Sequence, residues 1–159
     1  MSRSAVEIRR PVPDDLEHLA RNLRDQDLAE LRASGRGADP LAALRQSVAV
    51  SRWSRVALVD EAPIAVFGCG EYGSLLAPIG VPWLMGTGAI VRHGRVLQRE
   101  ARRYIAAMLQ QYPRLFNAVH AENTVSVRWL RHLGFTLHPA VPAPPHGALF
   151  HAFEMTRDV

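Results

Sequence analysis

The chain has 159 residues, of which 48% are hydrophobic and 21% charged, and its formal net charge is +4. This size and composition are typical of one globular domain spanning 1–159, and no apolar run reaches the ~18 to 20 residues that a membrane span needs. The first ten residues lack the apolar core of a signal peptide, and a lone cysteine excludes an internal disulfide, so we expect a cytoplasmic protein with no membrane partner.

The basic residues are all arginines, and they are spread along the chain. A nucleic-acid-binding protein would gather them on one face with aromatic residues between them, so nucleic acid is not the expected partner. The densest group fits either a solvated helix face or the binding of a phosphorylated small molecule. Seven histidines occur without a metal-binding spacing, and we expect no metal site. The dense arginine group consists of Arg92, Arg95, Arg99, Arg102 and Arg103.

The first third of the chain reads as a strand followed by helices. A short strand is expected at 6–10, where two prolines end it. Leucine and alanine recur at helical spacing over 14–23 and again over 28–31. Asp39 followed by proline is a cap and first-turn pair, which predicts a third helix from residue 40 to about residue 51.

The middle of the chain alternates between strands and one long helix. Residues 55–59 and 64–68 are apolar runs on either side of a short turn, which predicts a hairpin-like pair. A loop rich in glycine and proline then leads to a strand at 82–85. The longest helix is expected over about 96–112, where a proline ends it, and a strand follows at 115–121.

The segment 123–135 predicts a short amphipathic helix. Its apolar residues fall on one arc at about 100° per residue, and its arginines and histidine fall opposite. Asn123 or Thr124 can cap the first turn, and Gly134 can adopt the left-handed conformation that ends the helix. A strand is expected from Phe135, and after a proline-rich loop the last strand covers 149–155.

The stretch 68–73 satisfies the spacing Gly-x-Gly-x-x-Gly after a strand. A dinucleotide-binding loop also needs a helix to begin there, and the prolines and glycine that follow prevent one. We therefore interpret this stretch as a flexible turn. Cys69 within it has no assignable acidic or histidine partner, so a buried strand thiol is expected rather than a nucleophile.

The helix over 123–135 resembles the signature segment of the GNAT superfamily of acyl-CoA-dependent N-acyltransferases. The resemblance implies an α/β (α+β) fold with a mixed, mostly antiparallel central sheet and flanking helices. In that fold a long helix joins a central parallel pair of strands, and the segment 82–121 has the order that such a unit requires. The matching residues are Asn123, Ser126, Arg128, Leu133, Gly134 and Phe135.

The resemblance also implies a cofactor, acetyl-CoA or another acyl-CoA. Its pantetheine arm would enter where the two central strands splay apart, and its pyrophosphate would rest on the start of the long helix, which offers unpaired N–H groups. The sequence keeps the family's glycine at Gly94, but Val96 stands where a small residue is expected. Arg92 and Arg95 can compensate through charge. The expected cofactor-binding residues are Ile90, Val91, Arg92, His93, Gly94, Arg95, Val96 and Asn123.

An N-acyltransferase needs a base for the attacking amine and donors for the oxyanion. The candidate bases are Glu71, His120 and Glu122, each of which could equally be an exposed residue at a strand end. Asn123 could orient the substrate or a cofactor amide, although helix capping alone accounts for it. Where many family members carry a tyrosine that protonates the thiolate, this chain has Leu130, which donates no proton.

Along nearly its full length the chain resembles one GNAT branch, the acetyltransferase-like virion morphogenesis proteins of T7-like tailed phages. The segments 82–84 and 128–130 are the most specific parts of this likeness. The first hypothesis is an acetyl-CoA-binding enzyme that acts on an unidentified amine. The alternative is an inactive GNAT-fold phage protein that acts in virion assembly or inside the virion, with virion proteins as partners. Location would then be the host cytoplasm or the virion, and a homodimer stays open.

Overall fold

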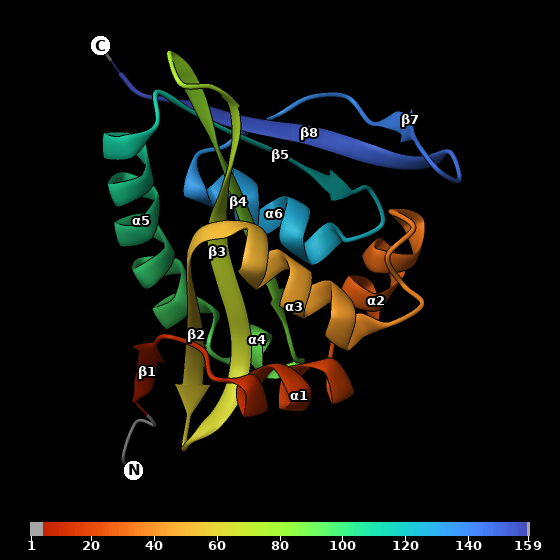
Figure 1. The fold of residues 1–159 in the computed structure, drawn as a ribbon, viewed down its shortest axis with the longest axis vertical. Helices are drawn as coiled ribbons and strands as arrows, with labels where there is room; N and C mark the ends of the chain where they lie inside the picture. Colours follow the sequence, from red (N-terminus) through yellow and green to blue (C-terminus); the bar gives the residue numbers. More distant parts are fainter. Residues whose placement is uncertain (1–4, 159) are drawn as a thin grey trace.

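In the computed structural model, which describes residues 5–158, one mixed sheet is flanked by helices on both faces (Figure 1). The elements in chain order are β1 Val6–Arg9, α1 Pro13–Arg21, α2 Asp25–Ala33, α3 Pro40–Val50, β2 Ser51–Val59, β3 Ala62–Ser74, β4 Ala77–Gly86, α4 Ala89–Arg92, α5 Gly94–Gln111, β5 Arg114–His120, α6 Thr124–Leu133, β6 Thr136–Leu137, β7 Val141–Ala143 and β8 Ala148–Thr156. None of these helices is long and apolar enough to cross a membrane.

The sheet has the strand order β1-β2-β3-β4-β5-β8-β6, with β7 paired to β8 at one end. All neighbouring strands run antiparallel except β4 and β5, which are parallel. Two parallel strands need a crossover connection, and α5 supplies it. The expected mixed, mostly antiparallel sheet with a central parallel pair is therefore confirmed.

The pairing between β4 and β5 covers only the starts of the two strands. The register joins Ile79 to Arg114 and Gly80 to Leu115, and the described residues of the two strands have no further pairs. Beyond this point β4 continues to Gly86, and β5 continues to the end of its own range. The strands therefore diverge. The side-chain amide of Asn117 donates a hydrogen bond across the opening gap to the carbonyl oxygen of Pro82, at 2.9 Å.

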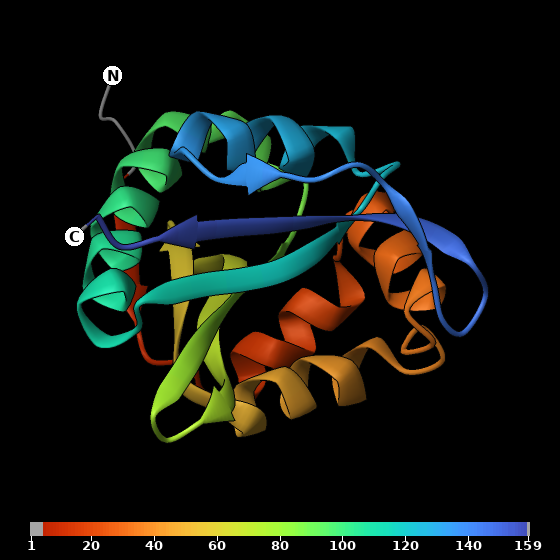
Figure 2. The ribbon, with the colours of Figure 1, turned by 90° about the horizontal axis from the view of Figure 1, so that it is seen from above.

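The two faces of the sheet carry separate hydrophobic cores. The first core joins α1, α2 and α3 to β2, β3 and β4, and the second joins α5 and α6 to β5 and β8, so the sheet lies between two helical layers (Figure 2). Alternate residues of one strand serve the two faces, as strand geometry requires. The first core includes Leu19, Leu44, Val56, Val66 and Met85, and the second includes Met108, Leu115, Val119, Leu133 and Phe153.

The stretch 68–73 is not a flexible turn, as the sequence suggested, but part of the long strand β3. It pairs residue by residue with β4, and the turn lies beyond it at Leu75 and Leu76. The glycines serve close packing, because a Cβ on Gly68 would lie 2.6 Å from the carbonyl oxygen of Trp53. The prediction of a loop before residue 82 is also wrong, because β4 begins at Ala77 and pairs with β3. Prolines are tolerated along an unpaired strand edge. From Val81 onward, β4 has such an edge on its β5 side.

Helix α6 has the predicted ends. The side chain of Asn123 accepts a hydrogen bond from the backbone N–H of Ser126 at 3.3 Å, and Gly134 has a left-handed φ of 98°. Val127 and Leu133 are buried as expected, whereas Val125 is 37% exposed because it lies in the first turn, at the edge of the apolar arc.

Smaller differences affect other element ends. The first predicted helix stops at Arg21, so that Leu23 can pair with Thr87 in an isolated bridge. The long helix begins at Gly94 rather than residue 96, which places the expected phosphate loop partly inside a helix. The proline-rich segment contains β7, which forms a hairpin with β8.

Candidate functional site

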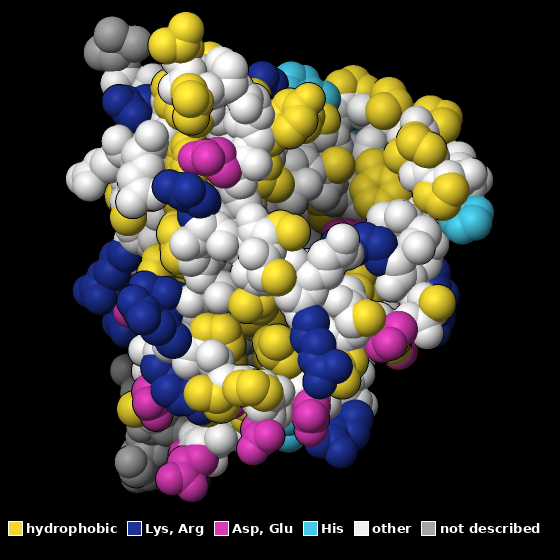
Figure 3. Space-filling view, viewed as in Figure 1, with side chains coloured by type: hydrophobic (Ala, Val, Ile, Leu, Met, Phe, Trp, Pro, Cys, Tyr) yellow, Lys and Arg dark blue, Asp and Glu magenta, His cyan; other side chains and the backbone are white. Residues whose placement is uncertain are grey.

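A cavity of about 810 Å³ occupies the gap between β4 and β5. It passes through the sheet, because its lining comes from α2 and α3 on one face and from α5 and α6 on the other. Figure 3 shows a hollow on the outer surface, with apolar side chains around it and an acidic side chain in its depth. Divergence of the two strands thus creates an internal space that reaches both helical layers.

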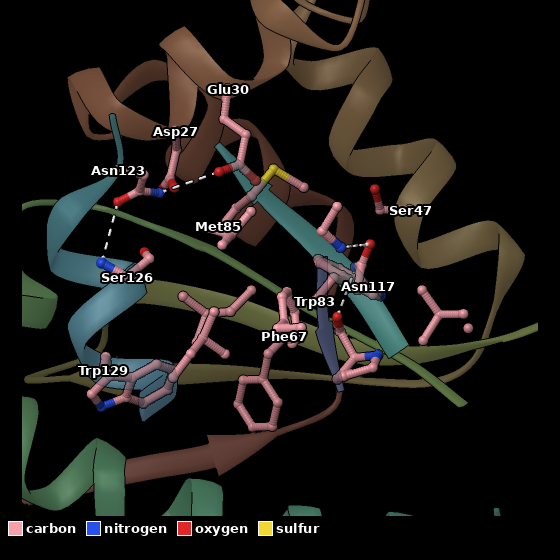
Figure 4. A pocket seen from close by; sticks show the side chains of 18 of the residues that line it. Asp27, Glu30, Ser47, Phe67, Trp83, Met85, Asn117, Asn123, Ser126 and Trp129 are labelled. Carbon is pink, nitrogen blue, oxygen red and sulfur yellow. Dashed lines mark hydrogen bonds between the residues drawn. The ribbon is translucent and has the colours of Figure 1, made fainter. Parts of the chain in front are cut away.

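The two walls of the cavity differ in chemistry. The wall from α5 and α6 is largely apolar and includes Leu97, Ala101, Ile105, Trp129 and Leu130. The wall from α2 and α3 is more polar and includes Asp27, Glu30, Ser34, Gln46 and Ser47. Figure 4 shows Asp27 and Glu30 reaching from α2 toward the same space as Asn123, Ser126 and Trp129 of α6. An apolar chain and a polar group can therefore meet inside the cavity.

Glu30 is the carboxyl group at the centre of this polar wall. Its Oε2 accepts a hydrogen bond from the backbone N–H of His120 at 3.1 Å and one from the side-chain amide of Asn123 at 3.4 Å. Burial raises the pKa of Glu30 above its ordinary value of 4.5, and the two hydrogen bonds oppose this rise in part. Asn123 therefore both caps α6 and holds the Glu30 carboxyl.

A buried ion pair fixes the edge of the site. The guanidinium of Arg24 donates to Asp27 through Nε at 3.0 Å and through Nη2 at 2.8 Å, and both side chains are about 95% buried. Asp27 also accepts the backbone N–H of Gly86 at 2.9 Å, and Arg24 contacts the Ser126 hydroxyl at 3.3 Å. These bonds tie the end of β4 to α2 and α6, so they hold one side of the gap in place.

Of the candidate bases from the sequence, His120 and Glu122 lie near the end of β5. The ring of His120 is buried against Phe150, with the ring centroids 5.2 Å apart, and its Nδ1 finds no hydrogen-bond partner among the described residues. Neither side chain belongs to the described lining of the cavity, and Glu122 is exposed. What His120 contributes to the site is its backbone N–H, which Glu30 accepts.

The third candidate base, Glu71, lies at the other end of the sheet. It pairs with Gly80, where β4 and β5 are still joined, and it accepts a hydrogen bond from the Tyr112 hydroxyl at 3.0 Å. Burial, together with this bond, raises the pKa of Tyr112 to about 12. The structure therefore does not bring Glu71 together with His120 and Glu122. Cys69 nearby is fully buried, and burial raises its pKa to about 11.

The expected cofactor segment lies beside the cavity rather than in it. None of the residues 90–96 belongs to the described lining, which meets α5 from Leu97 onward. Ile90 packs partly buried against the core that contains Ala57 and Ile64, while Val91 is 63% exposed. His93 precedes α5, the first turn of that helix is Gly94, Arg95 and Val96, and the side chains of Arg92 and Arg95 are exposed.

Leu130 lines the cavity at the place where the resemblance implies a tyrosine. Of the three tyrosines, Tyr104 is the one in the described lining, and its ring stacks on Trp53 with centroids 5.4 Å apart. Tyr72 is 72% exposed on the hairpin of β3 and β4, away from the cavity lining.

Sequence reasoning missed the polar residues of α2. Arg24, Asp27 and Glu30 recur every three residues, and this spacing puts them close to one side of a helix. A line of charges at that spacing is normally a solvated face. Here these side chains face the interior, and Asp27 and Glu30 line the cavity. The helical spacing alone does not show this, because it depends on where the gap in the sheet lies.

Solved structures that align with this chain over nearly its full length include acetyltransferases. An acetyltransferase of the GNAT family from Bacillus anthracis aligns with 97% of this chain and 96% of its own, at a TM-score of 0.72 and 12% identity. RimL, a ribosomal L7/L12 α-N-protein acetyltransferase solved with coenzyme A, aligns with 99% of this chain and 96% of its own, at a TM-score of 0.71 and 10% identity.

The chain has the GNAT acetyltransferase fold. YncA from Salmonella typhimurium, solved with its cofactor acetyl-CoA, aligns with 98% of this chain and 96% of its own, at a TM-score of 0.63 and 13% identity. No protein-family model and no curated protein sequence matches the chain.

Proposed function

We propose that this protein is an acyl-CoA-dependent N-acyltransferase that binds acetyl-CoA and transfers the acetyl group to an amine. The observation that carries the proposal is the cavity between β4 and β5, which is lined by an apolar wall and a polar wall. Its apolar wall suits an extended thioester arm, and its polar wall suits an amine.

The backbone of β4 supports the fit of acyl-CoA. From Val81 to Gly86 this strand pairs with β3 on one side but has no β5 partner on the other. The two ends of this stretch are already bonded, because the carbonyl oxygen of Pro82 accepts from Asn117 and the backbone of Gly86 bonds to Asp27 and Arg24. The backbone between Pro82 and Gly86 is the part of the strand edge that an extended chain with amide groups can match. When bound there, acetyl-CoA supplies an acetyl group activated as a thioester. The start of α5, with Arg92 and Arg95 exposed beside it, suits the pyrophosphate.

Isothermal titration calorimetry with acetyl-CoA tests this proposal. We expect saturable binding by the wild-type protein, and about tenfold weaker binding by Arg95→Glu, because phosphate contacts from arginine are charge-assisted. Arg103→Glu is the matched control, since Arg103 is an exposed arginine of the same helix about two turns further on. Absence of binding at millimolar acetyl-CoA would overturn the proposal. An equal loss of acetyl-CoA affinity in both variants would mean that the pyrophosphate does not bind at Arg95.

A second candidate function is a catalytically idle GNAT scaffold that acts in phage virion assembly. Leu130 favours it, because no proton donor stands at that place in the cavity. The turn between β3 and β4 favours it as well, because Leu75 and Leu76 are 99% and 98% exposed and offer an apolar contact to a virion protein. The same titration separates the two candidates, since an idle scaffold needs no acetyl-CoA.

A further inference from the structure

We propose that Glu30 binds the ammonium group of the acceptor and removes its proton before attack on the thioester. This inference rests on the proposed function and deepens it, because it assigns the catalytic base and the charge of the substrate. Among the described residues, three carboxylates line the cavity: Asp27, Glu30 and Glu100.

Two of the three carboxylates already have cationic partners. Asp27 is held by the guanidinium of Arg24 and by a backbone N–H. Glu100 lies on the α5 wall, where Arg103 approaches it at 3.4 Å and Arg99 at 3.7 Å. Glu30 forms no ion pair within residues 5–158, and its hydrogen-bond donors, a backbone N–H and a neutral amide, carry no charge. Neighbouring charges act on the pKa of Glu30 in opposite directions, because that of Asp27 raises it and that of His120 lowers it. A buried carboxylate with no cation bonded to it is costly, and a cationic ligand would relieve that cost.

The geometry leaves one oxygen of Glu30 for such a ligand. Both protein donors bind Oε2, while Oε1 has no hydrogen-bond partner among the described residues. Figure 4 shows the carboxyl group between α2 and α6, at the top of the space that Met85, Phe67 and Trp129 line below it. An ammonium group bound to Oε1 would therefore lie inside the cavity, facing the gap where β4 has no partner.

Burial also suits Glu30 to the transfer of a proton. A base works best when its pKa is close to the working pH, and an ordinary glutamate is too weak a base for this task. Burial raises the pKa of Glu30, whereas the two hydrogen bonds keep its ionised form accessible. Asn123 is thereby a positioning residue, because it orients the carboxyl group through its amide while its oxygen caps α6.

Glu30 takes one proton from the ammonium group, and the nitrogen lone pair attacks the thioester carbonyl carbon. A C–N bond forms, the C–S bond breaks, and its electron pair leaves with sulfur. The second proton of the nitrogen goes to the thiolate, so the products are an amide and a thiol. Glu30 then releases its proton to solvent.

Steady-state kinetics of Glu30→Gln tests the catalytic part. The probes are acetyl-CoA with phenethylamine, spermidine or a short peptide with a free N-terminus, and thiol release is the readout. We expect kcat/KM to fall by about 100-fold or more, as for loss of a general base, and the acid limb of the pH profile to vanish. Acetyl-CoA affinity by calorimetry should stay unchanged. Glu61→Gln is the matched control, because Glu61 is exposed in the turn between β2 and β3 and does not line the cavity, and it should keep kcat/KM within about threefold of the wild type.

A second measurement tests amine binding without turnover. The side-chain carboxyl carbon of Glu30, labelled with ¹³C and assigned by its loss in Glu30→Gln, should titrate above pH 4.5, and its midpoint should fall when an amine probe binds beside it. An unchanged midpoint with every probe, or a Glu30→Gln variant that stays active, overturns the role of Glu30. Failure of the wild-type protein to bind acetyl-CoA would instead overturn the proposed function, and with it the catalytic step.

Discussion

At the scale of single residues, Glu30 makes the stability of the protein depend on pH. Its native pKa lies above the unfolded value of 4.5, so the native state binds more protons than the unfolded state between these two values. The free energy of unfolding therefore falls as pH rises through this window and is constant above it. In Glu30→Gln this contribution is absent. In urea denaturation from pH 4 to pH 8, the free energy of unfolding of the wild type minus that of the variant should fall as pH rises and then level off. A difference independent of pH would contradict the raised pKa.

Leu130 offers a gain-of-function test at the same scale. It lines the cavity where a proton donor is absent, so Leu130→Tyr would place a hydroxyl group near the departing thiolate. We expect kcat to rise about tenfold, toward the lower part of the range for general acid catalysis, with unchanged acetyl-CoA affinity. Leu130→Phe has nearly the same shape without the hydroxyl, and it should show no rise. Equal rates in the two variants would mean that sulfur leaves without help from this position.

Some site residues could be predicted from the sequence because their roles are local. Asn123 and Gly134 act on the backbone within one helical turn of themselves. Gly134 was predicted to end the helix, and Asn123 was one of the two residues predicted as its cap. Glu30 could not be predicted in this way. Its importance depends on partners 90 and 93 positions away in the chain, His120 and Asn123, which only the folded structure places beside it.

At the scale of elements, the Arg24–Asp27 pair connects α2 to β4. Removing one member leaves the other charge buried and unpaired, which costs about 3–5 kcal/mol. Asp27→Ala should therefore lower the free energy of unfolding by about 3 kcal/mol in guanidinium denaturation. The double variant Arg24→Met with Asp27→Leu should recover most of this loss, because no charge is left buried. A loss below about 1 kcal/mol in the single variant would show that the pair does not hold this edge of the cavity.

The hairpin of β3 and β4 shows why some elements could not be predicted. Glycine and proline normally indicate turns, and the sequence over 68–82 is rich in both. In the structure the glycines of β3 allow close approach of Trp53 and β4, and the prolines lie along a strand with an unpaired edge. Tertiary contacts therefore override the local preference. The boundaries of α3 and α6, which depend on Asp39 and Asn123 as caps, were predicted closely.

At the scale of the whole molecule, the fold was predicted from the resemblance of the segment 123–135 to the GNAT signature, together with an order of strands and helices that agrees with it. The resemblance implies a central parallel pair of strands, and the sheet confirms it. The cavity exists because β4 and β5 pair only at their starts and then diverge. The length of this pairing depends on the register of the two strands, which composition does not reveal. Sequence patterns therefore located the two strands but not the polar wall that faces them.

The central claim is that the gap between β4 and β5 holds a thioester. A crystal structure of the protein soaked with acetyl-CoA tests it most directly. We expect electron density for an extended arm along β4 between Val81 and Gly86, with its acetyl end toward Glu30. Density for acetyl-CoA elsewhere on the molecule, or an unoccupied gap at saturating acetyl-CoA, would show that this gap is not the acetyl-CoA site.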